Sequence, residues 1–277
     1  MTRRWLITGC STGLGRALAE AVAASGQQVL ATARNPETLE DLRDRYPRTL
    51  ATCALDVCDP DDCHNAVHAT LARYGGVDVL VNNAGAGHFG AVEEVTEAEL
   101  QAQLAVNLIA PWRLTRMVLP LMRAQGFGDI VMVSSTAGRT AYPGLGAHSA
   151  AKYALEGMVE TLSLELAGSG VHAMAVEPGT FQTEWGTSLT ESTENIPAYG
   201  RVVSPMLAGL RALKSLPVAN PPELFAAQLM RLIDSDERPV RTPIGEDAWI
   251  SLLDAAQRDY TALLNARQIP VPVPAPV

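Results

Sequence analysis

The sequence predicts a single α/β domain, in which helices cover both faces of a doubly wound parallel β-sheet. Short apolar runs alternate with longer amphipathic segments along most of the 277 residues. Such runs are typical of strands buried on both faces, and a strand, a helix and a second strand form a right-handed crossover. Because 47% of the residues are hydrophobic and no Gly- or Ser-rich linker interrupts the pattern, we expect one core.

We expect seven strands in this sheet, at residues 4–8, 28–33, 50–55, 77–82, 128–134, 171–176 and 239–244. Six amphipathic segments lie between them, near 13–25, 37–45, 60–74, 96–125, 145–169 and 221–234. Residues 184–220 mix turn-forming residues with large apolar ones, so we expect a helical lid there, followed by a C-terminal extension. The domain then spans residues 1–269, and the Pro-rich segment 270–277 is predicted to be an extended tail.

The net charge and the hydropathy of the chain argue against two classes of partner, nucleic acids and membranes. A net charge of −9 argues against nucleic acid or an anionic membrane as the main partner. No apolar run approaches the roughly 20 residues that a spanning helix needs. The first eight residues resemble a strand and lack the features of a signal peptide. We therefore expect a cytoplasmic protein without a membrane span.

The four cysteines, Cys10, Cys53, Cys58 and Cys63, lie in the first quarter of the chain. Cys63 is close to His64 and His68, which raises the question of a metal site. However, no Cys-x-x-Cys pair is present, and Asp59-Pro60 is typical of a helix start at this point. We expect reduced structural thiols and no metal.

A glycine-rich turn follows the first predicted strand. It contains Gly9, Ser11, Thr12, Gly13, Leu14 and Gly15, and a helical pattern begins within it. Glycines at such a junction allow a tight turn and close approach to a pyrophosphate, and the free N–H groups of the helix N-terminus attract the anion. Because the required strand and helix flank the turn, it predicts a dinucleotide site.

The three-residue spacing between Gly9 and Gly13 resembles that of the short-chain dehydrogenase/reductase family, and further motifs follow in register over about residues 3–185. They are Asp56-Val57, Asn82-Asn83-Ala84-Gly85, Asn107, Ser134-Ser135, and Pro178-Gly179 with Thr183. The resemblance implies a Rossmann domain in which Asp56, Val57, Asn83, Ala84, Gly85, Lys152, Pro178, Gly179 and Thr183 contribute to the cofactor site. The opening turn and the long C-terminal part look like the hydroxysteroid and retinol dehydrogenase branch.

The end of the second strand indicates which dinucleotide is bound. A site that prefers NAD needs a carboxylate there for the ribose 2′-hydroxyl. This sequence has Ala33 and then Arg34, whose forked guanidinium suits a 2′-phosphate. We therefore expect NADP(H), although Arg34 could also be merely solvated after the strand.

The resemblance also implies a catalytic group, with one departure. Asn107, Ser135 and Lys152 match the family's asparagine, serine and lysine. His148 occupies the position of the family's tyrosine, 13 residues after Ser135 and four before Lys152. Residues at i and i+4 share one helix face, so His148 and Lys152 should project together into the site.

Imidazole is a competent acid or base near neutrality, but the positive charge of Lys152 should lower the pKa of His148. Two tyrosines lie nearby. Tyr153 follows Lys152 directly and should face away, whereas Tyr142 could replace the missing phenol.

We expect an NADP(H)-dependent oxidoreductase that interconverts a carbonyl and an alcohol, with His148 as the acid/base. The apolar lid suits a bulky, apolar substrate. Two alternatives remain open at this stage. The first is a non-redox epimerase, dehydratase or cyclase that uses His148 for proton transfer, and the second is a non-catalytic NADP(H)-binding protein. The resemblance further implies a homodimer or homotetramer built on the helices near 96–125 and 145–169.

Overall fold

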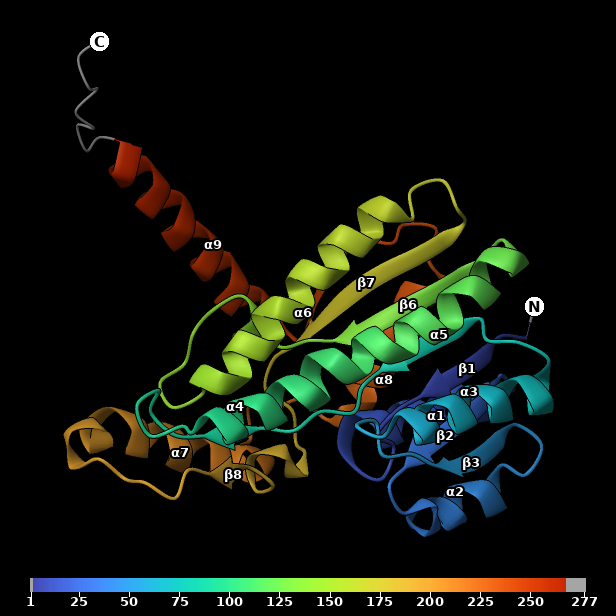
Figure 1. The fold of residues 1–277 in the computed structure, drawn as a ribbon, viewed down its shortest axis with the longest axis horizontal. Helices are drawn as coiled ribbons and strands as arrows, with labels where there is room; N and C mark the ends of the chain where they lie inside the picture. Colours follow the sequence, from blue (N-terminus) through green and yellow to red (C-terminus); the bar gives the residue numbers. More distant parts are fainter. Residues whose placement is uncertain (1, 268–277) are drawn as a thin grey trace.

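The structure, a computed structural model, describes residues 2–267 and is centred on a seven-stranded parallel sheet (Figure 1). The strand order is β3–β2–β1–β4–β6–β7–β9. The bounds are β1 (Arg4–Ile7), β2 (Gln28–Ala33), β3 (Leu50–Ala54), β4 (Val79–Asn82), β6 (Gly128–Val133), β7 (Val171–Pro178) and β9 (Arg241–Ile244). The predicted doubly wound sheet is confirmed. The order reverses between β1 and β4, and ligands bind at such a switch point in open α/β sheets.

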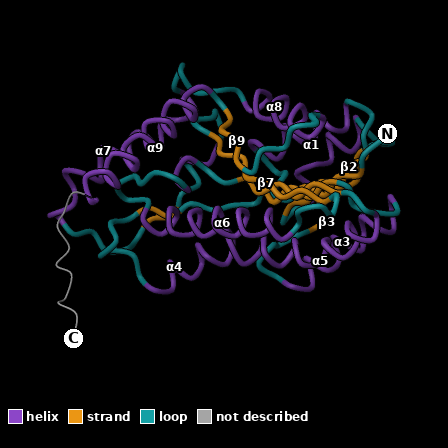
Figure 2. The backbone as a smooth tube through the Cα atoms, turned by 90° about the horizontal axis from the view of Figure 1, so that it is seen from above, coloured by secondary structure: helices purple, strands orange, loops and turns teal. Residues whose placement is uncertain are grey.

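Helices cover both faces of the sheet, as Figure 2 shows. One face carries α1 (Gly13–Ala24), α2 (Glu40–Arg45) and α8 (Pro222–Asp234). The other carries α3 (Pro60–Tyr74), α5 (Ala110–Gln125) and α6 (Gly146–Glu165). Each layer has its own apolar core, and Trp5 and Phe225 are fully buried in the first. These two cores hold the carboxyl ends of the strands in fixed register.

The segment predicted as one helix over 96–125 is instead broken in the middle. Thr96 and Glu99 form a capping box at the start of α4 (Glu97–Leu104). A π-helical turn, Ala105–Ile109, then separates α4 from α5. The amphipathic pattern does not reveal this turn, because it leaves the helix direction nearly unchanged. The π-turn contains the buried Asn107, and such turns are frequent at functional sites.

Residues 184–220 contain short 3₁₀ turns, the strand β8 (Thr190–Glu191) and the helix α7 (Gly200–Ala212). β8 pairs in parallel with β5 (His88–Phe89), a contact that the sequence did not predict. Both ring nitrogens of the buried His88 lie 2.9 Å from hydroxyl oxygens of this segment, those of Thr190 and Ser192. We call residues 184–220 the lid segment. Whether it opens, and where the domain ends, stay predictions.

After the lid segment the chain forms α8 and β9 and then α9 (Glu246–Arg267), which extends away from the sheet (Figure 1). The predicted tail, 270–277, lies outside the described residues. Between residues 2 and 267, no helix is long and apolar enough to cross a membrane. In the same range, no three His, Cys, Asp or Glu side chains are grouped to hold a metal ion, and the four cysteines are free.

Candidate active site

A cavity of about 710 Å³ lies at the carboxyl ends of the strands, between the glycine-rich turn and the lid segment. Nearly all the predicted site residues line it: Gly9, Ser11, Thr12, Gly13, Leu14, Arg34, Asp56, Val57, Asn83, Ala84, Gly85, Asn107, Ser135, His148, Lys152, Pro178, Gly179 and Thr183. Gly15 is the exception, because it packs behind the turn. The fold therefore brings residues from the whole predicted motif set to one cavity.

The glycine-rich turn needs its glycines for conformation and for space. Gly9 has a φ of +71°, which side chains with a Cβ rarely adopt, and a Cβ there would lie 2.7 Å from Ala84 Cα. A Cβ on Gly15 would collide with the Asn83 side chain. The turn is thus pressed against the end of β4. Asn83 holds it there, since its Nδ2 donates to Thr8 O at 2.8 Å and Gly9 O at 3.0 Å.

The N-terminus of α1 is open toward the cavity. Its N-cap residue, Thr12, makes no side-chain hydrogen bond to the first turn. The N–H groups of a helix start that lack such a cap are available to an anion, and the helix dipole favours negative charge there. A Cβ on Gly13 would lie 3.2 Å from Thr183 Cγ2, so the residue just before the lid segment approaches the same point. This cradle fits a pyrophosphate.

The far end of the cavity carries a cation. Arg34 follows β2 and is exposed, and Asp56 and Val57 line the wall beside it. Asp56 Oδ1 accepts a hydrogen bond from Cys58 N at 2.9 Å, so the carboxylate is committed to its own turn. No ion pair involves Arg34 within residues 2–267. Arg34 and Lys152 are the cations that line the described cavity.

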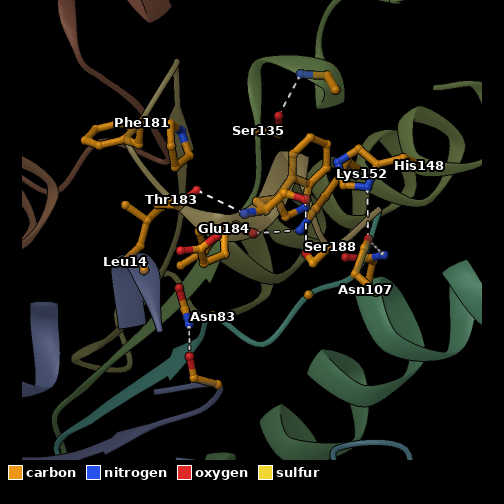
Figure 3. Close-up of a pocket in the computed structure, with 18 of the residues that line it drawn as sticks. Leu14, Asn83, Asn107, Ser135, His148, Lys152, Phe181, Thr183, Glu184 and Ser188 are labelled. Atoms are coloured by element: carbon orange, nitrogen blue, oxygen red, sulfur yellow. Dashed lines mark hydrogen bonds between the residues drawn. The ribbon is translucent and has the colours of Figure 1, made fainter. Parts of the chain in front are cut away.

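The predicted catalytic group lies at the opposite end, with His148 and Lys152 together on α6 (Figure 3). Both are buried, and Lys152 Nζ donates to Val133 O at 2.8 Å. His148 Nδ1 lies 3.2 Å from Ala86 O, and Asn107 Nδ2 donates to the same oxygen at 2.9 Å. The structure thus brings His148, Lys152 and Asn107 together. The carbonyl oxygen of Ala86 contacts both His148 and Asn107.

Burial dominates the electrostatics of this group. It lowers the pKa of Lys152 to about 8, against the opposing effect of the nearby Glu156 carboxylate. It also lowers the pKa of His148 to about 3, and the charge of Lys152 acts in the same direction. At neutral pH His148 is therefore uncharged, while Lys152 is close enough to its pKa to exist in both forms.

Ser135 and Tyr142 complete the wall, and each is already engaged. Ser135 Oγ accepts from Ala137 N at 3.1 Å and so caps a short 3₁₀ turn. The hydroxyl of Tyr142 donates to Thr136 Oγ1 at 3.1 Å and lies 3.3 Å from Ser251 Oγ. Tyr153 is 47% exposed and does not line the cavity, as its helix position predicts. The hydroxyl of Tyr142 thus already has two partners, Thr136 and Ser251.

Sequence reasoning missed three contributors to the site. Ala86 acts through its backbone carbonyl, so its identity carries no signal. Trp185 packs 5.2 Å from the His148 ring, measured between centroids. Asp247, in the first turn of α9, accepts from Thr180 N at 2.5 Å and from Asn220 Nδ2 at 2.9 Å. Asp247 lies three residues after the end of the seventh strand, so it could have been placed at this edge, where parallel strands end.

The burial of Lys152 predicts a cost in stability. Lys152→Met should raise the free energy of unfolding at pH 7 by about 2 kcal/mol, because the unfolded chain solvates an ammonium that the folded protein buries. Between about pH 8 and pH 10.5 the unfolded chain keeps a proton that the folded wild type has lost. The free energy of unfolding of the wild type should therefore rise with pH over this range, and the difference between wild type and Lys152→Met should become smaller.

Urea denaturation of both proteins from pH 6 to pH 10 measures this difference. Lys214→Met is a matched control, because Lys214 is exposed and its ion pair with Glu184 lies at the surface. It should change stability by less than about 0.5 kcal/mol. A Lys152→Met variant that is less stable than wild type at pH 7 would contradict the prediction.

Comparison with known proteins places this site in a family. The family model described as short chain dehydrogenase matches residues 3–194. The oxidoreductase BOA17 from Botryotinia fuckeliana is 36% identical over 250 residues, which is 90% of each chain. The NADPH-dependent 3-dehydrocapnine reductase from Ornithobacterium rhinotracheale is 35% identical over 65% of this chain and 66% of its own.

Solved structures agree. A short-chain dehydrogenase from Streptomyces avermitilis has a TM-score of 0.86 and 40% identity, and the match covers 97% of this chain and 98% of that one. An alcohol dehydrogenase from Thermococcus sibiricus, complexed with 5-hydroxy-NADP, has a TM-score of 0.72 and 25% identity, over 88% and 96% of the two chains. From the family match and these relatives, the chain belongs to the short-chain dehydrogenase family and is an oxidoreductase with a nicotinamide dinucleotide site.

Proposed function

We propose that this protein is an NADP(H)-dependent oxidoreductase that interconverts a carbonyl and an alcohol on a bulky apolar small molecule. One observation carries the proposal: a single cavity connects an uncapped helix N-terminus and Arg34 with the buried pair His148 and Lys152. This lining suits a dinucleotide whose phosphates bind at the helix N-terminus and whose reacting ring binds beside His148 and Lys152.

The roles of the residues follow from their places around the cavity. The glycine-rich turn and the start of α1 hold the pyrophosphate, with Asn83 fixing the turn. Asp56 and Val57 would bound the adenine end, and Lys152 would hold the nicotinamide ribose. Ala84, Gly85, Pro178, Gly179 and Thr183 form the remaining walls. When bound, the nicotinamide supplies a donor or acceptor of hydride, and the protein supplies orientation and proton transfer.

Arg34 supports NADP(H) over NAD(H). Its guanidinium is exposed at the adenine end, where the 2′-substituent of the ribose is read. No carboxylate follows β2 directly, so the ribose 2′-hydroxyl lacks its usual acceptor at that point. The Ornithobacterium relative is named an NADPH-dependent reductase, which agrees with this preference.

The lid segment supports an apolar substrate. It lines the cavity with Trp185, Met206, Leu210, Leu213 and Leu216, and Tyr142 and Leu145 face them from the loop before α6. Pockets of this kind bind through buried apolar surface, while a few polar groups set orientation. Here those polar groups are His148, Ser135 and Ser188.

We assign proton transfer to His148, which lines the cavity beside Lys152 in the position of the family's tyrosine. The engaged hydroxyl of Tyr142 makes that residue a weaker candidate. The curated relatives of this chain are named oxidoreductases or reductases, which favours redox chemistry over an epimerase, a dehydratase or a binding protein.

The cofactor assignment predicts a selective effect at one arginine. Arg34→Asp should weaken NADPH binding about 10- to 100-fold, since a charge-assisted hydrogen bond is lost and a like charge is introduced. NADH binding should change less than about threefold. Isothermal titration of both cofactors measures this. Arg43→Asp, at an exposed arginine of α2, is the control. Equal losses for NADPH and NADH would refute the 2′-phosphate assignment.

The assignment of His148 predicts loss of turnover with retention of the cofactor. His148→Ala should lower kcat about 10²- to 10⁴-fold, the usual contribution of general acid or base catalysis. NADPH affinity should stay nearly unchanged. The assay follows NADPH in both directions with bulky apolar ketones and their alcohols, and His148→Tyr tests whether a phenol restores activity. Full activity of the alanine variant would transfer the role to Tyr142 or to water.

We also propose a homodimer or homotetramer built on α5 and α6. These helices expose Trp112, Tyr153 and Leu164, and large apolar side chains on one layer suit a subunit interface. Light scattering should give two or four times the mass of one chain. Trp112→Glu with Leu164→Glu should shift it toward the monomer, and Val218→Glu, at an exposed position of the lid segment, should not. A monomeric wild type would end this proposal.

A further inference from the structure

We infer that His148 meets the substrate only as a hydrogen-bond acceptor and base, through Nε2, so that the site is built to receive the alcohol form of its substrate. This inference rests on the proposed function, which places the reacting carbon beside His148. The contact between Nδ1 and Ala86 O places the ring hydrogen on Nδ1, and Nε2 is then left without one.

The contact with Ala86 determines which nitrogen of His148 carries hydrogen. Nδ1 lies 3.2 Å from the carbonyl oxygen of Ala86. A carbonyl oxygen only accepts, so Nδ1 must be the donor. A neutral imidazole has one N–H group, and its other nitrogen is then a bare lone pair. Nε2 has no hydrogen-bond partner within the described chain and belongs to a side chain that lines the cavity.

The Ala86 carbonyl is itself fixed in place. Asn107 Nδ2 donates to the same oxygen at 2.9 Å, so two donors share one acceptor. Asn107 is held in turn by the π-turn and by Gln103 O, which lies 3.1 Å from its Nδ2. A flipped His148 ring would leave Ala86 with one donor fewer in a buried place. The arrangement therefore holds one tautomer.

The ring also stays uncharged. His148 is 3% exposed, and Lys152 lies one helical turn away on the same face. Burial, followed by that charge, lowers the pKa of His148 to about 3. At pH 7 the ring is therefore neutral.

The carboxylates that line the cavity are engaged elsewhere. Glu184 pairs with Lys214, and Asp56 accepts from its own turn. Asp247 accepts from Thr180 N and from Asn220. No carboxylate among the described residues pairs with His148, and the hydrogen bond with Ala86 O, which acts to raise the pKa of His148, is a smaller effect than burial or the charge of Lys152.

A neutral His148 with a bare Nε2 offers the substrate a different hydrogen bond from the one that a tyrosine hydroxyl would offer. A phenol both donates and accepts, so it can hydrogen-bond to a ketone as well as to an alcohol. Nε2 of His148 presents a lone pair, which a ketone oxygen cannot satisfy and a hydroxyl can. A site whose buried group is left unpaired by one form of a ligand discriminates against that form.

The chemical step balances in the direction of oxidation. The O–H bond of the alcohol breaks, and its proton moves to Nε2 of His148. A bound oxidised nicotinamide would accept the hydrogen on the adjacent carbon with its electron pair, so that a C=O bond forms. The imidazolium then loses the Nε2 proton to solvent and returns to the neutral tautomer. Lys152, whose pKa lies near 8, repels this imidazolium less once it has lost its own proton.

Nitrogen NMR of the NADP⁺-bound protein tests the inference without any turnover. The chain has five histidines, so ring ¹⁵N signals can be assigned by comparison with His148→Asn. We expect Nδ1 protonated and Nε2 unprotonated for His148, unchanged from pH 8 to pH 5. A hydrogen on Nε2 at pH 7, in either a neutral or a charged ring, would overturn the inference.

Binding of matched probes gives a second readout. α-Tetralol and 1-methoxytetralin both carry an acceptor oxygen, but only the alcohol carries a donor hydrogen, and neither can be oxidised in the NADPH complex. The ratio of their affinities should fall about tenfold or more in His148→Asn, which keeps a donor near the Nδ1 position and removes Nε2. His148→Gln, which places an amide near the Nε2 position, is a second variant that keeps the test possible if His148→Asn does not fold. A ratio that is the same in wild type and both variants would contradict the inference.

The two proposals fail in different ways. Equal losses of NADPH and NADH in Arg34→Asp would refute the cofactor assignment and leave the tautomer of His148 untouched. A protonated Nε2 would refute the acceptor role, even in an enzyme that oxidises NADPH with bulky ketones.

Discussion

The segment that follows β4, residues 83–90, contacts the glycine-rich turn, His148, Asn107 and the lid segment, and the arrangement of the site depends on it. Asn83 and Ala84 hold the glycine-rich turn, through hydrogen bonds and through close approach to Gly9. Ala86 accepts from both His148 and Asn107. The chain next passes under the lid segment, where Gly87 leaves space for Trp185 and Leu189. One loop thereby sets the distance between the phosphate end and the reacting end.

The site is held at a cost in folding free energy. Lys152 is buried without an ion pair in the described chain, and two further buried charges lie behind it. Glu156 pairs with Arg241 at 2.9 Å, and Glu177 pairs with Arg139 at 3.3 Å. Burial and the charge of Glu156 raise the pKa of Glu177 to about 7. Groups perturbed in this way cluster at functional sites, where the surrounding core compensates for them.

The sequence predicted the sheet well because buried parallel strands and crossover helices leave a strong periodic pattern. It also predicted which motif residues meet, since the carboxyl ends of parallel strands share one edge. It could not predict the π-turn at Asn107, which changes hydrogen bonding without changing the pattern of apolar residues. Nor could it predict Ala86, because a backbone carbonyl has no residue identity. For His148 it predicted the direction of the pKa shift from Lys152, whereas burial is the larger cause.

The effect of having an imidazole in place of the family's phenol depends on the backbone carbonyl of Ala86. A histidine in the same helix position could adopt either tautomer if its Nδ1 faced water. Here the loop after β4 presents a carbonyl to Nδ1, and Asn107 fixes that carbonyl from the other side. The polarity of the substrate contact is therefore set by a main-chain atom of the loop that follows β4. Replacing His148 by tyrosine would return a hydroxyl to the cavity but would leave the Ala86 carbonyl with Asn107 as its remaining side-chain donor.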